Sequence, residues 1–326
     1  GYYSGGAQKF GDFVMGGGDF VTAPEMTPLF GLTLANQVAE VLKQTGGDVL
    51  ELGAGTGKLA LTVLQGLKEK NQLPEHYYIL DVSAHLRQIQ KETLSAQLPA
   101  DIFTRVQWLD CLPEKLTGVV LGNEVLDALT VKIVTLQNGI WYERGLIFEE
   151  GFQWHNKLLE DQYILSHLPV DLPEGYVTEV CPTAKAVIRS LANCLEKGLI
   201  LMLDYGFGVA EYYHPQRSLG TLMCHYQHLA HSNPLIYLGL QDITAHVNFT
   251  AIADAAMLEG LELNGYCNQA QFLINCGILE LMSKVSPNDL AIYAPMAAAA
   301  QRLLSPAEMG ELFKVIALSK GLTTPF

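Results

Sequence analysis

Basic residues are scarce in this chain of 326 residues, where 20 lysines and arginines stand against 34 aspartates and glutamates and leave a formal net charge of -14. An acidic surface repels phosphate backbones and anionic lipid, so the charge balance disfavours a nucleic-acid or membrane-surface role. Long apolar runs are missing too. The best candidates, 119–121 and 200–203, fall far short of the roughly 18 residues that a membrane span needs, and we expect no such span.

Cysteines are few, and they follow no motif. The six cysteines include no Cys-x-x-Cys pair, so we expect free thiols in a reducing compartment. His225, His228 and His231 follow Cys224, but histidines at this spacing do not converge on one face of a helix, and we expect no metal site. Charged residues make up 17% of the chain and apolar residues 49%, which excludes intrinsic disorder and predicts about two domains, or one domain with large insertions.

Short apolar runs alternate with helical periods along the first 130 residues and again after residue 183. The expected strands are 48–52, 77–82, 106–109, 118–122, 198–204 and 312–319, and the expected helices are 29–42, 58–69, 84–98, 183–195, 249–259, 268–283 and 291–304. Strands that alternate with helices indicate βαβ crossovers, so we predict an α/β fold with a mostly parallel sheet. Between residues 131 and 182 the pattern changes to short strands with an Asn138-Gly139 turn, which indicates an antiparallel insertion.

A glycine-rich turn, Glu51–Gly57, joins the first strand to the helix that follows it. Glycines there let the backbone approach a ligand and leave the N-terminal amides of the helix facing that ligand. The spacing is G-x-G-x-G, whereas a dinucleotide fold prefers G-x-G-x-x-G. Glu51 at the strand end would repel a pyrophosphate but attract the cationic amino-acid moiety of S-adenosylmethionine. The turn therefore favours S-adenosylmethionine over a dinucleotide.

Two further acids follow the next two strands. Asp81 is placed to accept hydrogen bonds from both ribose hydroxyls of an adenosine ligand, and Asp110 to reach the adenine amino group. The alternative is that both acids only cap the helices after them. Acids at three successive strand ends favour the ligand interpretation.

The fourth strand is followed by Asn123-Glu124-Val125-Leu126-Asp127, which faces the same crevice because ligands of open α/β sheets bind at the carboxyl ends of the strands. Glu124 and Asp127 would share a face if this segment were helical, and two carboxylates can orient a guanidinium by charge-assisted hydrogen bonds. The alternative is a capping Asp127 and a solvated Glu124.

The fifth strand ends at Asp204-Tyr205. We expect Asp204 to complete an acidic substrate site and Tyr205 to pack against a substrate side chain, with a purely structural role as the alternative. Further along the chain, His246 is expected to be a buried, hydrogen-bonded histidine, and a position in the cleft is the alternative.

Together these segments resemble the MidA family, whose mitochondrial members are arginine methyltransferases that assist the assembly of respiratory complex I. The resemblance spans nearly the whole chain. The segments that carry it, in the order of the family, are Gly18–Glu25, Glu51–Gly57, Asn123–Ala128, Asp204–Gly206, Gly220–Leu222, Asp242–Phe249 and Met309–Val315.

The resemblance implies a class I, Rossmann-like methyltransferase fold, S-adenosylmethionine as cofactor, and symmetric dimethylation of an arginine on a complex I subunit. The residues expected to bind the cofactor are Glu51, Gly53, Gly55, Thr56, Gly57, Asp81, Asp110, Asn123, Thr22 and Glu25. Those expected at the methyl acceptor are Glu124, Asp127 and Asp204. The sequence departs from the family pattern at Ala54 and Thr130, where proline is common, and at Asp81, where glutamate is common.

These inferences divide the chain into four parts. The expected parts are a glycine- and aromatic-rich lid at 1–35, a cofactor-binding core at 36–130 and 183–210, the antiparallel insertion at 131–182, and a substrate-side helical region with the last strands of the sheet at 211–326. We expect residues upstream of Gly1, because the family usually carries a helical segment there.

The predicted partner is a protein that bears an arginine, and we expect a homodimer. The compartment would be the cytoplasm in a bacterium or the mitochondrial matrix in a eukaryote. Two other functions remain open at this point. They are an assembly chaperone that binds S-adenosylmethionine without catalysis and an NAD-dependent oxidoreductase.

Overall fold

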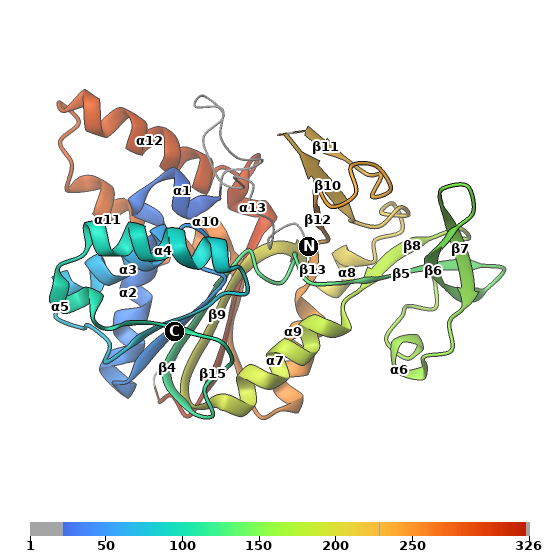
Figure 1. The fold of residues 1–326 in the computed structure, drawn as a ribbon, viewed down its shortest axis with the longest axis horizontal. Coiled ribbons are helices and arrows are strands. Elements are labelled where there is room, and N and C mark those ends of the chain that lie inside the picture. The colour runs from blue at the N-terminus through green and yellow to red at the C-terminus, as the bar shows by residue number, and fades with distance from the viewer. Residues whose placement is uncertain (1–21, 228, 324–326) are drawn as a thin grey trace.

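The computed structural model describes residues 22–227 and 229–323, so the expected lid at 1–35 falls mostly outside the described residues. A mixed sheet in the order β14-β15-β9-β4-β1-β2-β3 forms its centre, and β13 pairs with β9 (Figure 1). Its strands are β1 (Asp48–Leu52), β2 (Tyr77–Leu80), β3 (Val106–Leu109), β4 (Leu116–Asn123), β9 (Leu195–Phe207), β13 (Val247–Asn248), β14 (Glu262–Asn268) and β15 (Phe313–Lys320). Among these described strands only β15 runs against the others, so the carboxyl ends of the remaining strands meet at one edge.

Helices cover both faces of the sheet, because alternate residues of the central strands point to opposite sides. Val49 and Val119 pack into a core with α2 and α3, whereas Leu50 and Val120 pack into a second core with α7 and α9 (Figure 1). The helices are α1 (Ala23–Met26), α2 (Pro28–Thr45), α3 (Lys58–Glu69), α4 (Ala84–Gln97), α5 (Ala100–Phe103), α6 (Gln162–Leu165), α7 (Pro182–Cys194), α8 (Val209–Tyr212), α9 (Phe249–Leu258), α10 (Gln269–Asn275), α11 (Ile278–Ser283), α12 (Leu290–Leu304) and α13 (Met309–Leu312).

The antiparallel insertion is a separate sheet that projects from the central one, on the right of Figure 1. Its strands, in the order β7-β6-β5-β8, are β5 (Lys132–Gln137), β6 (Ile140–Phe148), β7 (Phe152–Leu158) and β8 (Val177–Val180). Asn138 and Gly139 both have positive φ, 50° and 73°, which is the backbone of the predicted two-residue hairpin turn. Strand β6 runs through Gly145 without a break and pairs with β7 along its length.

A third sheet, β11-β10-β12, is formed by β10 (Met223–Tyr226), β11 (Leu229–His231) and β12 (Asp242–Thr244). Met223 and His225 pair with Thr244 and Asp242, so these four side chains share one face. His231 pairs with Cys224 on the opposite face, and His228 lies outside the described residues. Within the described ranges no group of three His, Cys, Asp or Glu residues could hold a metal ion.

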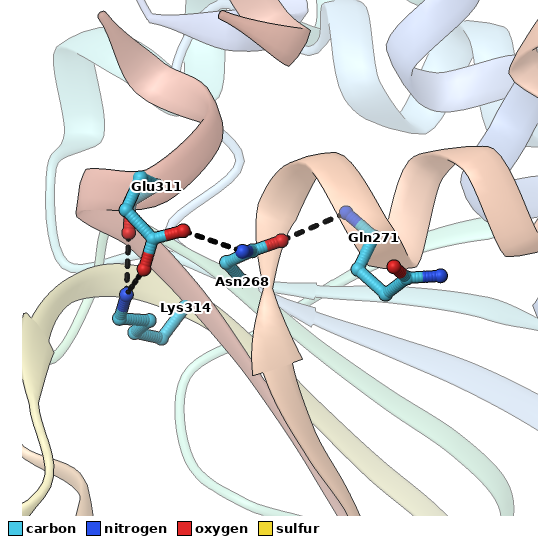
Figure 2. A network of polar contacts seen from close by, with 4 residues as sticks. All are labelled: Asn268, Gln271, Glu311 and Lys314. Carbon is cyan, nitrogen blue, oxygen red and sulfur yellow. Dashed lines mark hydrogen bonds and ion pairs between the residues drawn. The ribbon is translucent and has the colours of Figure 1, made fainter. Parts of the chain in front are cut away.

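A polar network fixes the junction of α13 with β15 (Figure 2). The buried Lys314 donates to Oε1 of Glu311 at 2.6 Å, and Asn268 donates to the other oxygen of that carboxylate. Asn268 also caps α10, because its Oδ1 accepts the N–H of Gln271 at 2.8 Å. These bonds hold the segment Leu312–Phe313, which lines the cavity described below.

The cysteines and the apolar helices were also the subject of predictions. The six cysteines are all free thiols. Among the helices in the described part of the chain, none has both the length and the apolar character to cross a membrane.

Candidate functional site

A cavity of about 810 Å³ lies at the edge of the sheet where the parallel strands end. Its walls include the ends of β1, β2, β4 and β9, the short helix α1, one face of β10 and β12, and the α13–β15 junction. The crevice that the sequence predicts at the carboxyl ends of the strands is therefore present, and most of the predicted site residues border it.

The glycine turn forms one end of this cavity. Gly53 and Gly55 have φ of 60° and 53°, and together with Thr56 they line the cavity just before α3 begins. Gly57 is not among the lining residues. It has φ of 88°, and a Cβ atom there would lie 3.3 Å from Cα of Gln90, so this glycine permits close packing against α4.

Glu51 lies at the floor of the same end and is 1% exposed. The hydroxyl of Tyr77 donates to its Oε2 at 2.7 Å. Burial, and then the charge of Asp81, raise the pKa of Glu51 to about 7, although the Tyr77 bond acts in the opposite direction. A positively charged ligand would stabilise the ionised form of this buried carboxylate, which agrees with the predicted attraction for a cationic amino-acid moiety.

Asp81 and Asp110 have different surroundings. Asp81 is 8% exposed, lines the cavity, and accepts the N–H of Ser83 at 2.8 Å. The side chain of Asp110 is 88% exposed, pairs with Arg87 at 2.6 Å and does not line the cavity. Asp81 is therefore placed for the predicted ribose contact, while the adenine contact of Asp110 stays a prediction that this geometry does not favour.

Helix α1 connects the two ends of the cavity. Glu25 accepts a hydrogen bond from the hydroxyl of Thr56 and pairs with Nζ of Lys58 at 2.6 Å. The backbone N–H of Ala23, two residues earlier, faces the carboxylate of Glu124 and favours its ionised form. Thr22 precedes the helix and also lines the cavity. The predicted cofactor residues Thr22 and Glu25 thus border the cavity, with Glu25 bound to the glycine turn.

Glu124 stands at the other end of the cavity, on the loop after β4. It is a non-glycine residue with φ of 53°, and Nδ2 of Asn123 donates to its Oε1 at 3.1 Å. Burial, followed by the charge of Asp127, raises the pKa of Glu124 to about 8. A left-handed backbone at a glutamate is costly, and such conformations persist where the surrounding structure enforces them, commonly at functional sites.

Asp127 lines the cavity beside Glu124 and is 4% exposed. It accepts a hydrogen bond from the hydroxyl of Tyr205, and burial raises its pKa to about 6. The loop is not helical, as the shared face of Glu124 and Asp127 would have required, because residues 124–130 form turns and bends. Both carboxylates nevertheless reach the same cavity, since the turn at 126–129 brings Asp127 back toward the strand end.

The prediction that Asp204 takes part directly in the acidic site needs correction. Asp204 is 1% exposed and does not line the cavity. Its Oδ2 accepts the backbone N–H groups of Val125, Leu126 and Asp127 at 3.1, 2.8 and 3.2 Å. Burial, and then the charges of Asp127 and Glu124, raise its pKa well above the usual range. Asp204 therefore holds the loop 125–127 in place, because both of its carboxylate oxygens accept hydrogen bonds from backbone N–H groups.

Three lining residues were not assigned to the site from the sequence. Asp242 and His225 face the cavity from the inner side of β12 and β10. His246 also lines it, with its ring 5.4 Å from that of Tyr205, and burial lowers its pKa to about 4. Nδ1 of His246 is buried and has no hydrogen-bond partner among the described residues, so the expected hydrogen-bonded histidine is not found at that atom. The motif Asp242–Phe249 was the available signal. For His246 the alternative prediction was a position in the cleft, and the residue does line the cavity.

The sequence also matches a known family. Over residues 33–267 it fits the family model described as "Putative S-adenosyl-L-methionine-dependent methyltransferase". The chain belongs to this methyltransferase family. Membership rejects the NAD-dependent alternative and makes S-adenosyl-L-methionine the cofactor, in agreement with the glycine spacing and with Glu51.

Similar proteins in this methyltransferase family include curated mitochondrial enzymes and solved bacterial structures. The protein arginine methyltransferase NDUFAF7 of Danio rerio is 27% identical over 93% of this chain and 77% of its own length, and that of Homo sapiens is 26% identical over 92% and 73%. A Burkholderia thailandensis protein whose crystal structure holds S-adenosyl-homocysteine is 48% identical, with a TM-score of 0.97 over 100% of this chain and 85% of that one. The fold is therefore that of a class I methyltransferase, as predicted.

Proposed function

We propose that this methyltransferase acts on an arginine side chain of a protein. The observation that supports it is the acidic end of the cavity, where Glu124, Asp127 and Asp242 gather. Lys58 is the single lysine or arginine among the described lining residues, and its ammonium group is paired with Glu25. A cationic acceptor would supply a positive charge beside the buried carboxylates of Glu124 and Asp127, since opposite charges in a partly desolvated site attract strongly.

The roles of the residues follow from the two ends of the cavity. Bound S-adenosyl-L-methionine supplies an electrophilic methyl group on a positively charged sulfur. Glu51 and Asp81 would hold its ammonium and ribose groups beside the glycine turn. Glu124 and Asp127 would bind the guanidinium by charge-assisted hydrogen bonds and hold one nitrogen toward the methyl group. Glu124 would accept the proton that this nitrogen loses on methylation.

The acceptor class also draws support from the relatives. The curated relatives are named protein arginine methyltransferases, and the resemblance to the MidA family adds a subunit of respiratory complex I as the proposed substrate, with symmetric dimethylation. We extend the proposal to a homodimer, located in the bacterial cytoplasm or in the mitochondrial matrix according to the source.

Transfer of a radioactive methyl group tests this function. The protein is incubated with S-adenosyl-L-[methyl-³H]methionine and a soluble extract, and the labelled proteins are hydrolysed and separated by amino-acid analysis. We expect label in methylarginine with the wild type and none with Glu124→Gln. Label in another amino acid would reject the arginine assignment. No label, with the cofactor still bound in a calorimetric titration, would favour the chaperone without catalysis.

A further inference from the structure

Strand β9 ends in two consecutive residues that both hold the loop 124–127 of β4. Asp204 bonds to the backbone of this loop, as described above, and its other oxygen, Oδ1, accepts the N–H of Tyr205 at 2.9 Å. Tyr205 bonds to the side chain of the same loop, because its hydroxyl donates to Oδ2 of Asp127. Asp127 is therefore fixed at both its backbone N–H and its carboxylate by adjacent residues of one strand.

The ring of Tyr205 is itself held in place from two sides. It makes edge contacts with Phe313 at 5.2 Å and with His246 at 5.4 Å between ring centroids. Phe313 belongs to the segment that the Lys314–Glu311 network fixes (Figure 2). A phenol ring packed in this way has little rotamer freedom, so its hydroxyl presents one fixed donor to Asp127.

We propose that Tyr205 is a positioning residue of the methyl-acceptor site, whose hydroxyl orients the Asp127 carboxylate while Asp204 fixes the backbone that carries it. The inference rests on the proposed arginine acceptor. With one carboxylate oxygen bound to Tyr205, a guanidinium meets the remaining oxygen in a preset direction, and no reorganisation is needed when the acceptor binds.

The same hydroxyl distinguishes the two carboxylates of the site. The Tyr205 bond stabilises the ionised form of Asp127 and so opposes the effect of burial on its pKa. Glu124 receives a hydrogen bond from Nδ2 of Asn123, and the backbone N–H of Ala23 favours its ionised form, but no hydroxyl group among the described residues donates to it. When the environments of two neighbouring acids separate their pKa values, one acid stays ionised while the other gains or loses a proton. Asp127 is then the permanent anchor of the guanidinium, and Glu124 the group that takes up the proton.

The variant Tyr205→Phe removes the hydroxyl and keeps the ring. Tyr212→Phe is the matched control, because Tyr212 is also a buried tyrosine whose hydroxyl donates, in its case to the carbonyl of Glu179 at 3.1 Å, and it does not line the cavity. The pKa of Asp127 is measured by ¹³C carboxyl NMR titration, assigned with Asp127→Asn. Affinity for S-adenosyl-homocysteine is measured by calorimetry, folding by thermal unfolding, and activity by methylarginine formation in the extract.

For Tyr205→Phe we expect the pKa of Asp127 to rise by about one unit, because a hydrogen bond to the charged form is lost. We expect methylarginine formation to fall roughly 10- to 100-fold, since small misplacements of an orienting group have effects of this size. Affinity for S-adenosyl-homocysteine should stay within about twofold. Tyr212→Phe should leave the Asp127 titration and the activity unchanged. An unchanged Asp127 titration in a folded Tyr205→Phe overturns the proposal.

The outcomes separate this inference from the proposed function. If the wild type forms no methylarginine, the arginine acceptor fails, while the carboxyl titration still decides whether Tyr205 orients Asp127. If Tyr205→Phe does not fold, the single variant Asp127→Asn decides, because it removes the charge but keeps an oxygen that can accept from Tyr205. Activity that survives in Asp127→Asn would remove the reason for positioning this side chain and would overturn the proposal.

Discussion

The side-chain amide of Gln90 donates to Oδ2 of Asp81 at 2.8 Å. The same nitrogen donates to the carbonyl of Gly55 at 3.0 Å, and Oε1 of Gln90 accepts the indole N–H of Trp108 at 2.9 Å. Gln90 is fully buried in α4, so this one amide joins the glycine turn to the acid after β2. The cofactor end of the cavity is thus preset by a residue that the cofactor need not touch.

Asp81→Ala should lower the affinity for S-adenosyl-homocysteine by roughly 10- to 100-fold, because hydrogen bonds to a charged group are lost. Asp110→Ala is the control, and we expect less than about a threefold change because its side chain is exposed and paired with Arg87. Isothermal titration calorimetry measures both. An equal loss in the two variants would restore the predicted adenine contact of Asp110.

Glu124→Gln should reduce methyl transfer by roughly 100-fold or more, because the amide can neither accept the proton nor pair with a guanidinium. Binding of S-adenosyl-homocysteine should persist, since Glu124 lies at the acceptor end. The exposed Glu114→Gln provides a matched change without effect. Turnover by Glu124→Gln at the wild-type rate would show that this carboxylate is not the proton acceptor.

The stability of the ligand-free protein should depend on the ionisation of Glu124. Its pKa is about 8 in the folded protein against 4.5 for the free group, so the folded state binds more protons between these values. The free energy of unfolding therefore falls as the pH rises through this window, and the contribution is fully present only below it. Urea unfolding at several pH values should show a steeper fall for the wild type than for Glu124→Gln. Parallel curves would contradict the raised pKa.

Asp204→Asn should destabilise the protein by about 1–3 kcal/mol. In the wild type, one carboxylate oxygen accepts the N–H of Tyr205 and the other accepts N–H groups of the loop 125–127. In either orientation of the new amide, its NH₂ group replaces one of these acceptors and leaves a buried backbone N–H without its hydrogen bond. Asp254→Asn, an exposed change in α9, should stay within about 0.5 kcal/mol. The midpoint of urea unfolding compares them. An unshifted midpoint for Asp204→Asn would mean that these bonds add no net stability.

The core of the fold was accessible from the sequence because buried parallel strands and amphipathic helices leave strong local patterns. The predicted strand at 48–52 and helix at 58–69 coincide with β1 and α3. The strand β14 was not predicted, because it is a half-exposed edge strand with a bulge between Leu263 and Gly265. The short strands β10–β12 were also missed, since three or four residues give too little alternation to detect.

For the site, the sequence indicated which acids follow the strands but could not give their orientation. Asp81 and Asp110 occupy equivalent positions in the pattern, yet one is buried against Gln90 and the other faces solvent. Asp204 is an acid at a strand end like Asp127, but it turns toward backbone donors. These differences arise from contacts between segments far apart in the chain, which a single sequence does not encode locally.

Of the described strands, β15 comes last in the sequence, yet it lies inside the sheet, between β9 and β14. During synthesis, the ribosome would therefore have produced every other described strand before Phe313–Lys320 could fill the place between β9 and β14. A polypeptide interrupted ahead of this point would present two unpaired strand edges, which invite aggregation. Loss of the segment from Phe313 onward would thus yield a species prone to aggregate, rather than a slightly shortened enzyme.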